Sequence, residues 1–185
     1  PLPVHGFLDA VILSHAHLDH CGAIPYLFFS SEPRVYTHPA TVPIAELLIM
    51  DSMNIAREKK QDSYNMSSVK RMMRNIRTVE YGREQKVSSN VSFRFQDAGH
   101  ILGASMTRIE ANGLSLVYTG DYKDEGTRLH TGAKPPKEAD VLIIEATYGN
   151  REHPSRKKLE KDFIDEIRKV LEAGGSVLVL SLIHI

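Results

Sequence analysis

The sequence contains a single cysteine, Cys21. One cysteine excludes a disulfide within the chain, and proteins of the reducing cytosol typically lack disulfides. We therefore predict a cytoplasmic protein. Cys21 could be read as a metal ligand, but a small thiol packed in the core is the better interpretation, since free cysteine is among the most buried residue types.

Excess charge and long apolar runs are also missing. The sequence has 23 Lys and Arg and 23 Asp and Glu, so its net charge is zero. Overall charge therefore gives no reason to expect a polyanionic partner, and any such site must be local. No run of about 18 apolar residues occurs, which predicts no membrane span. The 185 residues suffice for one domain with a substantial core.

Residues 14–22 read Ser-His-Ala-His-Leu-Asp-His-Cys-Gly and concentrate four potential metal ligands. These are His15, His17, Asp19 and His20. Residues 8–14 are mostly apolar and β-prone, which predicts a short buried strand that leads into this polar segment. Imidazole and carboxylate together suit Zn²⁺ or a similar divalent ion. The spacing could serve two adjacent ions, with the first two histidines on one ion and the Asp-His pair on the other. A polar loop with chance histidines is the alternative.

A further histidine, His100, follows an expected strand at residues 91–95. It lies between Gly99 and Gly103, where the backbone can turn sharply. We predict that it is the third histidine of the ion held by His15 and His17. The alternative is a histidine of the core.

Two carboxylates follow other expected strands. The strand at 115–119 ends in Gly120-Asp121, and a carboxylate there can bridge two ions. Residues 141–144 are continuously apolar, which predicts a strand buried on both faces, and Glu145 follows it. A carboxylate at the tip of a buried strand is unfavourable unless it serves a site or is paired. We therefore assign both acidic residues to the site, at the sheet edge that also collects the histidines.

The remaining elements have ordinary local signals. Apolar residues at helical spacing predict a helix from Thr41 to about Glu58, a second from Ser67, and a third from Pro154-Ser155 to Gly174-Gly175. Asn112-Gly113 predicts a hairpin turn between two strands. Further strands are expected at residues 34–37, 79–81, 106–111 and 176–180.

Basic residues gather in one stretch of the otherwise neutral chain. Residues 57–86 contain nine Lys and Arg and four Asp and Glu, a local excess of five positive charges, together with Tyr64 and Tyr81. Such a stretch suits a nucleic-acid backbone. A solvated helical face is the alternative interpretation.

These motifs resemble those of the metallo-β-lactamase superfamily. His15-Ala16-His17-Leu18-Asp19-His20 is similar to its signature loop. The segments Ala98–Ala104, Tyr118–Tyr122 and Glu145–Arg151 resemble, in order, later motifs of its β-CASP nuclease branch. The similarity covers nearly all of the chain. It is greatest to the group that contains the cleavage and polyadenylation specificity factor endonuclease and its archaeal counterparts.

The resemblance implies an α/β fold, the αβ/βα sandwich, with two zinc ions at one sheet edge. Zinc is expected because the iron-binding branch usually has Glu in place of His17. Carried over by position, His15, His17 and His100 would hold one zinc. Asp19 and His20 would hold the other, and Asp121 would bridge the two ions. Glu145 would be the acidic residue of the motif that opens the β-CASP cap.

Two departures from the family pattern concern the ends of the chain. The first family motif, an Asp on an early strand, has no counterpart, and residues 181–185 do not resemble the family's continuation. We therefore expect a fragment whose sandwich is incomplete at both ends, so that one ligand of the second zinc is missing. Residues 1–150 would be a partial core and residues 151–185 the start of a truncated cap, with weak or no activity alone.

The predicted function is zinc-dependent hydrolysis of RNA phosphodiester bonds, in RNA 3′-end processing or decay. Two ions would lower the pKa of bound water to about 7 and provide the attacking hydroxide. Asp19 could orient the nucleophile, and Glu145 could assist proton transfer to the leaving oxygen. The expected partners are RNA and either a second copy or subunits of a processing complex. The alternatives are a thioester or lactam hydrolase on the same fold, or a non-catalytic scaffold relative.

Overall fold

The computed structural model describes residues 8–61, 63–152 and 154–179. It divides into two compact units, Pro1–Glu145 and Ala146–Ile185. The expected domain boundary after residue 150 lies close to this division, but the identity of the two domains stays a prediction.

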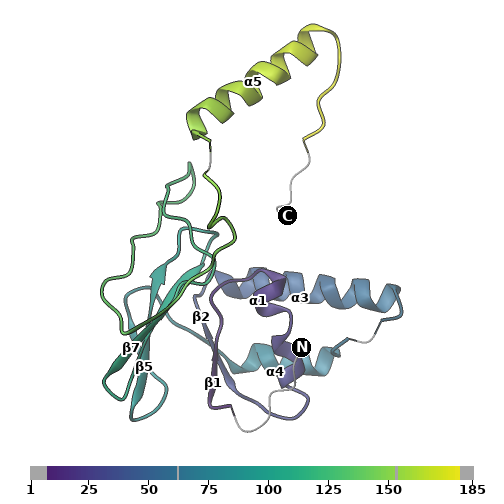
Figure 1. The fold of residues 1–185 in the computed structure, drawn as a ribbon. Coiled ribbons are helices and arrows are strands. Elements are labelled where there is room, and N and C mark those ends of the chain that lie inside the picture. Colours follow the sequence, from purple (N-terminus) through teal and green to yellow (C-terminus); the bar gives the residue numbers. More distant parts are fainter. Residues whose placement is uncertain (1–7, 62, 153, 180–185) are drawn as a thin grey trace. The chain divides into compact units, whose positions relative to one another are not determined.

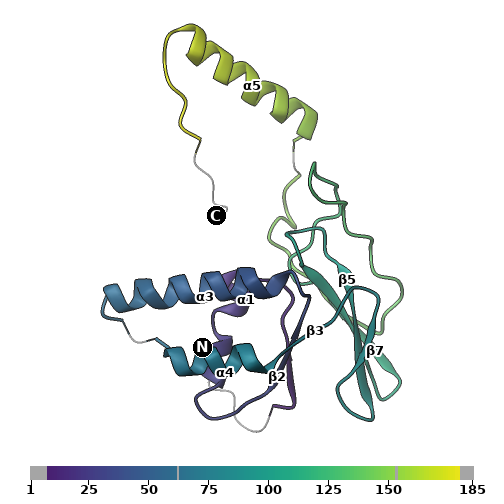
Figure 2. The same ribbon diagram turned by 180° about the vertical axis from the view of Figure 1, so that it is seen from behind.

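The first unit begins with a parallel three-stranded sheet in the order β1 (Ala10–Ile12), β2 (Arg34–Thr37), β3 (Ile76–Thr78). Parallel neighbours need crossover connections, and helices supply them. The short α1 (Leu18–Cys21) and α2 (Ile24–Leu27) connect the first pair, and α3 (Thr41–Glu58) and α4 (Met66–Asn75) connect the second. Figures 1 and 2 show α3 and α4 on one side of β2, with β5 and β7 of the second sheet on the other.

Alternate residues of β2 enter two different cores, as the period of a strand requires. Val35 is fully buried in the cluster that contains Ile49 of α3 and Met72 of α4. Tyr36 belongs to a second cluster with Phe93 and Phe95 of β5. The first sheet is therefore the middle layer of three, which explains why its strands are short and strongly apolar.

The second sheet has the order β4 (Glu84–Lys86), β5 (Val91–Asp97), β6 (Ser105–Ala111), β7 (Leu114–Tyr118), β8 (Val141–Ile143). Its pairs are antiparallel except for β7 and β8, which are parallel. Asn112 and Gly113 both have positive φ, 51° and 81°, as a two-residue hairpin between β6 and β7 requires. The mixture of sheets and helices confirms the predicted α/β class.

The strand predicted at residues 79–81 is wrong. The structure has β3 at Ile76–Thr78 instead, and the chain then crosses between the sheets. The Val79 amide still donates to the Thr37 carbonyl of the first sheet at 2.9 Å, whereas the Gly82 amide donates to Phe95 of the second at 2.8 Å. The apolar alternation at 79–81 therefore reflects packing between the sheets, where Val79 is buried.

The predicted burial of residues 141–144 is also wrong. The strand β8 forms, but Val141, Leu142 and Ile143 are each about half exposed, at 47–50%. It is the last strand of its sheet among the described residues, paired with β7. An apolar run records that side chains can be buried, but only neighbouring elements decide whether they are.

The second unit contains α5 (Arg156–Glu172), which confirms the third predicted helix. Its apolar side chains, among them Leu159 and Phe163, are exposed, and the helix contains no buried residue. The predicted strand at 176–180 is absent from residues 176–179, and residue 180 lies outside the described part. In the described residues, no helix is both long and apolar enough to cross a membrane.

Candidate metal centre

The chain that leaves β1 carries the first cluster of predicted ligands. The Leu13 amide still donates to Tyr36 of β2 at 2.9 Å, and His15 follows with no exposed surface. His17 is the N-cap of α1, so Asp19 and His20 lie in one helical turn rather than in the predicted open turn. This compact turn directs the side chains of His15, His17 and His20 into a small volume, where their rings contact one another.

His100 reaches the same place from the second sheet, on the loop between β5 and β6. Gly99 and Gly103 have positive φ, 66° and 80°. A Cβ on Gly99 would lie 2.4 Å from the Lys123 carbonyl oxygen, so this turn accepts only glycine. The far end of the loop is held by two hydroxyl groups: Thr41 Oγ1 donates to Gly103 O at 2.9 Å, and Tyr81 donates to Ala104 O at 2.8 Å.

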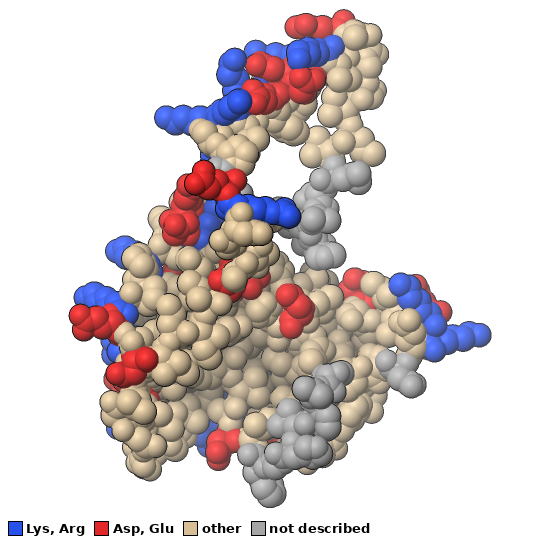
Figure 3. All heavy atoms as spheres, in the orientation of Figure 1, with Lys and Arg blue, Asp and Glu red and all other residues tan. Residues whose placement is uncertain are grey.

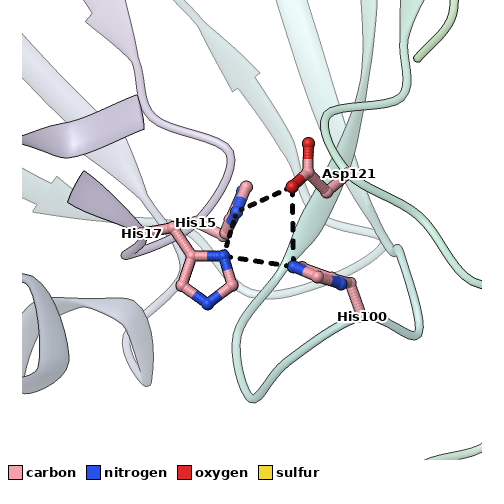
Figure 4. A group of neighbouring side chains, drawn as sticks. All are labelled: His15, His17, His100 and Asp121. Atoms are coloured by element: carbon pink, nitrogen blue, oxygen red, sulfur yellow. Dashed lines mark hydrogen bonds and ion pairs between the residues drawn. The ribbon is translucent and has the colours of Figure 1, made fainter. Parts of the chain in front are cut away.

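Four side chains converge on one point, as Figure 4 shows: His15, His17, His100 and Asp121. His17 Nδ1 lies 3.1 Å from His15 Nε2 and 3.2 Å from His100 Nε2. Asp121 Oδ2 lies 3.7 Å from His15 Nε2 and 3.6 Å from His100 Nε2. Ligands of tetrahedral zinc, at about 2.0–2.1 Å from the ion, are about 3.3–3.4 Å apart. The four side chains therefore fit a zinc-sized cation without rearrangement.

The electrostatics of this group favour metal ligation over protonation. Burial, followed by the neighbouring His20, His100 and His17, lowers the pKa of His15 to about 3. Burial also lowers the pKa of His100, although Asp121 opposes this effect. The imidazoles are thus neutral near pH 7, and neutral imidazole is the form that binds metal. Three ring nitrogen atoms that face one another need a shared cation to make their contacts favourable.

A second group lies on the other side of Asp121. His20 Nε2 lies 3.3 Å from Asp121 Oδ1 and 3.5 Å from Asp19 Oδ2. The side chain of Asp19 is 76% exposed, so its carboxylate faces solvent. All six predicted ligands therefore lie in two adjacent groups, and Asp121 belongs to both.

Glu145 lies behind this pair of groups. Its Oε1 accepts a hydrogen bond from the Tyr122 amide at 3.0 Å, and its own amide donates to Thr119 Oγ1 at 3.3 Å. These contacts tie the end of β8 to the residues on either side of Gly120 and Asp121. Glu145 thus contacts the segment that carries Asp121, and its catalytic role stays a prediction.

Cys21 is buried and points away from the ligand group. Its Sγ donates to the Ala16 carbonyl oxygen at 3.0 Å, and burial raises the pKa of the thiol to about 12. The structure therefore favours the core thiol over the metal ligand.

The basic stretch is distributed over several elements. Its Lys and Arg residues lie at the end of α3, on α4 and β3, and near or within β4 of the second sheet. Figure 3 shows basic side chains beside acidic ones at the free end of α3, on the right of the view. Arg71 pairs with Glu32 at 3.7 Å. The choice between an RNA-binding and a solvated surface stays open at this point.

Ser14 was not singled out by the sequence patterns, although it contacts the ligands. Its Oγ lies 3.1 Å from His15 Nδ1 and 3.5 Å from His20 Nδ1. The one sequence signal is its position directly before the histidines. Its other contacts, to Ser105 and Gly120, join distant parts of the chain and leave no local pattern.

Comparisons with known proteins give consistent matches. Residues 5–135 match the family model described as the metallo-beta-lactamase superfamily domain. An RNase J-like protein of Methanocaldococcus jannaschii is 39% identical over 176 residues, which cover 93% of this chain and 40% of that protein. The transcription termination factor FttA of Methanothermobacter thermautotrophicus is 36% identical over 179 residues, 93% of this chain and 28% of that protein.

A eukaryotic protein shows the same degree of similarity. The cleavage and polyadenylation specificity factor 73 of Drosophila melanogaster is 35% identical over 176 residues, 93% of this chain and 26% of that protein. The chain therefore spans less than half the length of these curated relatives.

Proposed function

Because the chain belongs to the metallo-beta-lactamase superfamily, we propose that it carries the metal-binding core of a zinc-dependent ribonuclease of the β-CASP branch. The reaction is hydrolysis of RNA phosphodiester bonds. The observation that supports this proposal most directly is the position of Asp121, whose two carboxylate oxygens face two different groups of potential ligands. One acidic side chain between two such groups suits a pair of divalent ions.

The ligands divide according to the atoms that face one another. His15, His17 and His100 hold one zinc, with Asp121 Oδ2 as the fourth ligand. Asp19, His20 and Asp121 Oδ1 hold the other. Bound divalent ions would lower the pKa of a coordinated water to about 7 and stabilise charge on a phosphoryl oxygen.

Two carboxylates have roles beyond holding the ions. Asp19 is exposed enough to accept a hydrogen bond from an attacking water and to orient it. Glu145 assists proton transfer to the leaving oxygen, directly or by holding a partner group. Its hydrogen bond to the Tyr122 amide keeps it beside the Asp121 segment. Both proposals require the substrate phosphate to lie over the exposed side of the two ligand groups.

RNA as the substrate class is supported by the relatives and by local charge. Two relatives are named RNases or RNase-like, and one is a subunit of the Integrator complex. The basic residues of the 57–86 stretch are mostly exposed and available for phosphate contacts. By the same comparison, we propose that the whole protein acts as a copy in an oligomer or as a subunit of a processing complex.

The test uses the full reading frame that contains this sequence. End-labelled single-stranded RNA is incubated with the protein and with its Asp121→Ala variant, and zinc is measured by elemental analysis. We expect chelator-sensitive cleavage, and at least about a 100-fold loss in the variant, since it lacks a ligand of both ions. Asp51→Ala on the exposed face of α3 is the matched control. Cleavage by metal-free Asp121→Ala protein would contradict the proposal.

A further inference from the structure

We propose that Ser14 is a positioning residue whose single hydroxyl orients one histidine of each zinc ion and so couples the two ions. The inference rests on the proposed two-zinc site and adds to it a residue that binds neither ion. Ser14 is 3% exposed and lies between the first sheet and the three segments that carry the ligands.

The hydroxyl lies behind both histidine rings. Ser14 Oγ is 3.1 Å from Nδ1 of His15 and 3.5 Å from Nδ1 of His20. The opposite nitrogen, Nε2, of each ring faces Asp121, at 3.7 Å for His15 and 3.3 Å for His20. Each ring therefore presents Nε2 to a metal position and Nδ1 to the same serine.

The tautomers of the two rings follow from this arrangement. A neutral imidazole has one N–H, and Nε2 can bind a metal only if that hydrogen is on Nδ1. Both Nδ1–H groups then need an acceptor, and a hydroxyl oxygen has two lone pairs. Ser14 Oγ can accept from both, while its own hydrogen is free for the side chain of Tyr118, which also hydrogen-bonds with Ser14. One serine thus satisfies two metal-binding histidines.

The backbone of Ser14 extends the same coupling to the other ligands. Its carbonyl oxygen accepts from the Ser105 amide at 2.9 Å, at the end of the loop that carries His100. Its side chain packs on Gly120, where a Cβ would lie 2.9 Å from Ser14 Cβ, directly before Asp121. Gly120 has φ 56° and leaves room for the serine. Ser14 is therefore in contact with every segment that supplies a ligand.

The experiment compares Ser14→Ala and Ser14→Thr with a matched control. Ser68→Ala removes another buried serine hydroxyl, which bonds Asn65 at 3.1 Å on α4, remote from the ligands in sequence and on the helical layer. Zinc affinity at both positions is measured by chelator competition in the full reading frame. Histidine tautomers are read from ¹⁵N NMR of the ring nitrogens.

We expect Ser14→Ala to weaken both zinc positions by about 10–100-fold, which is typical for loss of a group that orients a metal-binding histidine. Ser14→Thr, which keeps the hydroxyl, should restore most of the affinity, and Ser68→Ala should leave it unchanged. In the unmodified protein, His15 and His20 should both carry hydrogen on Nδ1. This last measurement keeps the inference testable if Ser14→Ala does not fold.

Three results would overturn the inference: unchanged affinity at both positions in Ser14→Ala, a loss confined to one position, or Nε2–H on either ring. Failure of the proposed function is distinguishable from these. An unmodified protein that binds no zinc, or binds zinc but does not cleave RNA, contradicts the function, whereas the Ser14 inference fails only by comparison of variants that bind zinc.

Discussion

Asp121 faces His20 with one carboxylate oxygen, Oδ1, at 3.3 Å from Nε2, and leaves Oδ2 for the contacts with His15 and His100. This division places a single acidic residue between two groups of ligands that come from distant parts of the chain. It has a direct consequence for metal stoichiometry.

Asp121→Asn should weaken both zinc positions in the full reading frame, whereas His17→Ala should weaken only one. Asparagine keeps the shape of the side chain but removes its negative charge from both groups. We expect a loss of more than about 100-fold for Asp121→Asn, because groups that only orient ligands already contribute about 10–100-fold. Zinc per chain, measured by elemental analysis after dialysis, should fall toward zero in the first variant and toward one in the second. Equal stoichiometry in the two variants would contradict the bridging position.

Gly103→Ala should destabilise the protein more than Gly113→Ala. The two glycines have nearly the same positive φ, 80° and 81°, but their surroundings differ. A Cβ at Gly103 would lie 2.6 Å from Thr41 Oγ1 and 2.8 Å from Thr41 N, whereas nothing lies within 4 Å of one at Gly113. We expect a loss of about 1 kcal/mol in unfolding free energy at Gly113, from backbone strain, and at least about 2 kcal/mol at Gly103.

Urea unfolding of the two glycine variants measures this difference. The Gly103 variant should also bind zinc less tightly, because the loop that it distorts carries His100, while the Gly113 variant should bind zinc normally. Indistinguishable unfolding midpoints would mean that the contact with Thr41 yields easily.

Cys21 should resist thiol reagents in the native protein and react once the chain is unfolded. Its side chain has no exposed surface, and its Sγ is hydrogen-bonded to the Ala16 carbonyl. A chromogenic disulfide reagent at pH 8 should show no reaction over the time in which the same protein reacts fully in concentrated urea. The unfolded sample is the internal control. Rapid labelling of the folded protein would show that the segment 15–22 opens readily.

The identity of the ligands was accessible from sequence because it depends on residue type and local spacing. The histidines and aspartate of residues 15–20 stand next to a β-prone run, and the glycines around His100 mark a sharp turn. The helix at Thr41–Glu58 and the Asn112-Gly113 hairpin were predicted for the same reason, since both depend on residues a few positions apart. The resemblance to the metallo-β-lactamase superfamily and its β-CASP branch, drawn from these motifs, is confirmed by the comparisons.

Burial and pairing were not accessible in this way. Residues 141–143 are as apolar as a buried strand but are half exposed, and residues 79–81 alternate like a strand but connect two sheets. In both cases the pattern describes the side chains correctly. What surrounds them depends on other segments, which no local window contains.

By itself, the sequence determined which side chains are available to bind metal and which short segments present them. Only the tertiary structure decided that Asp121 lies between the two groups, with a different oxygen toward each, and that Ser14 contacts a histidine of both. The physical reason is that local propensity acts over a few residues, whereas these contacts join residues about a hundred positions apart and arise only when two sheets pack together.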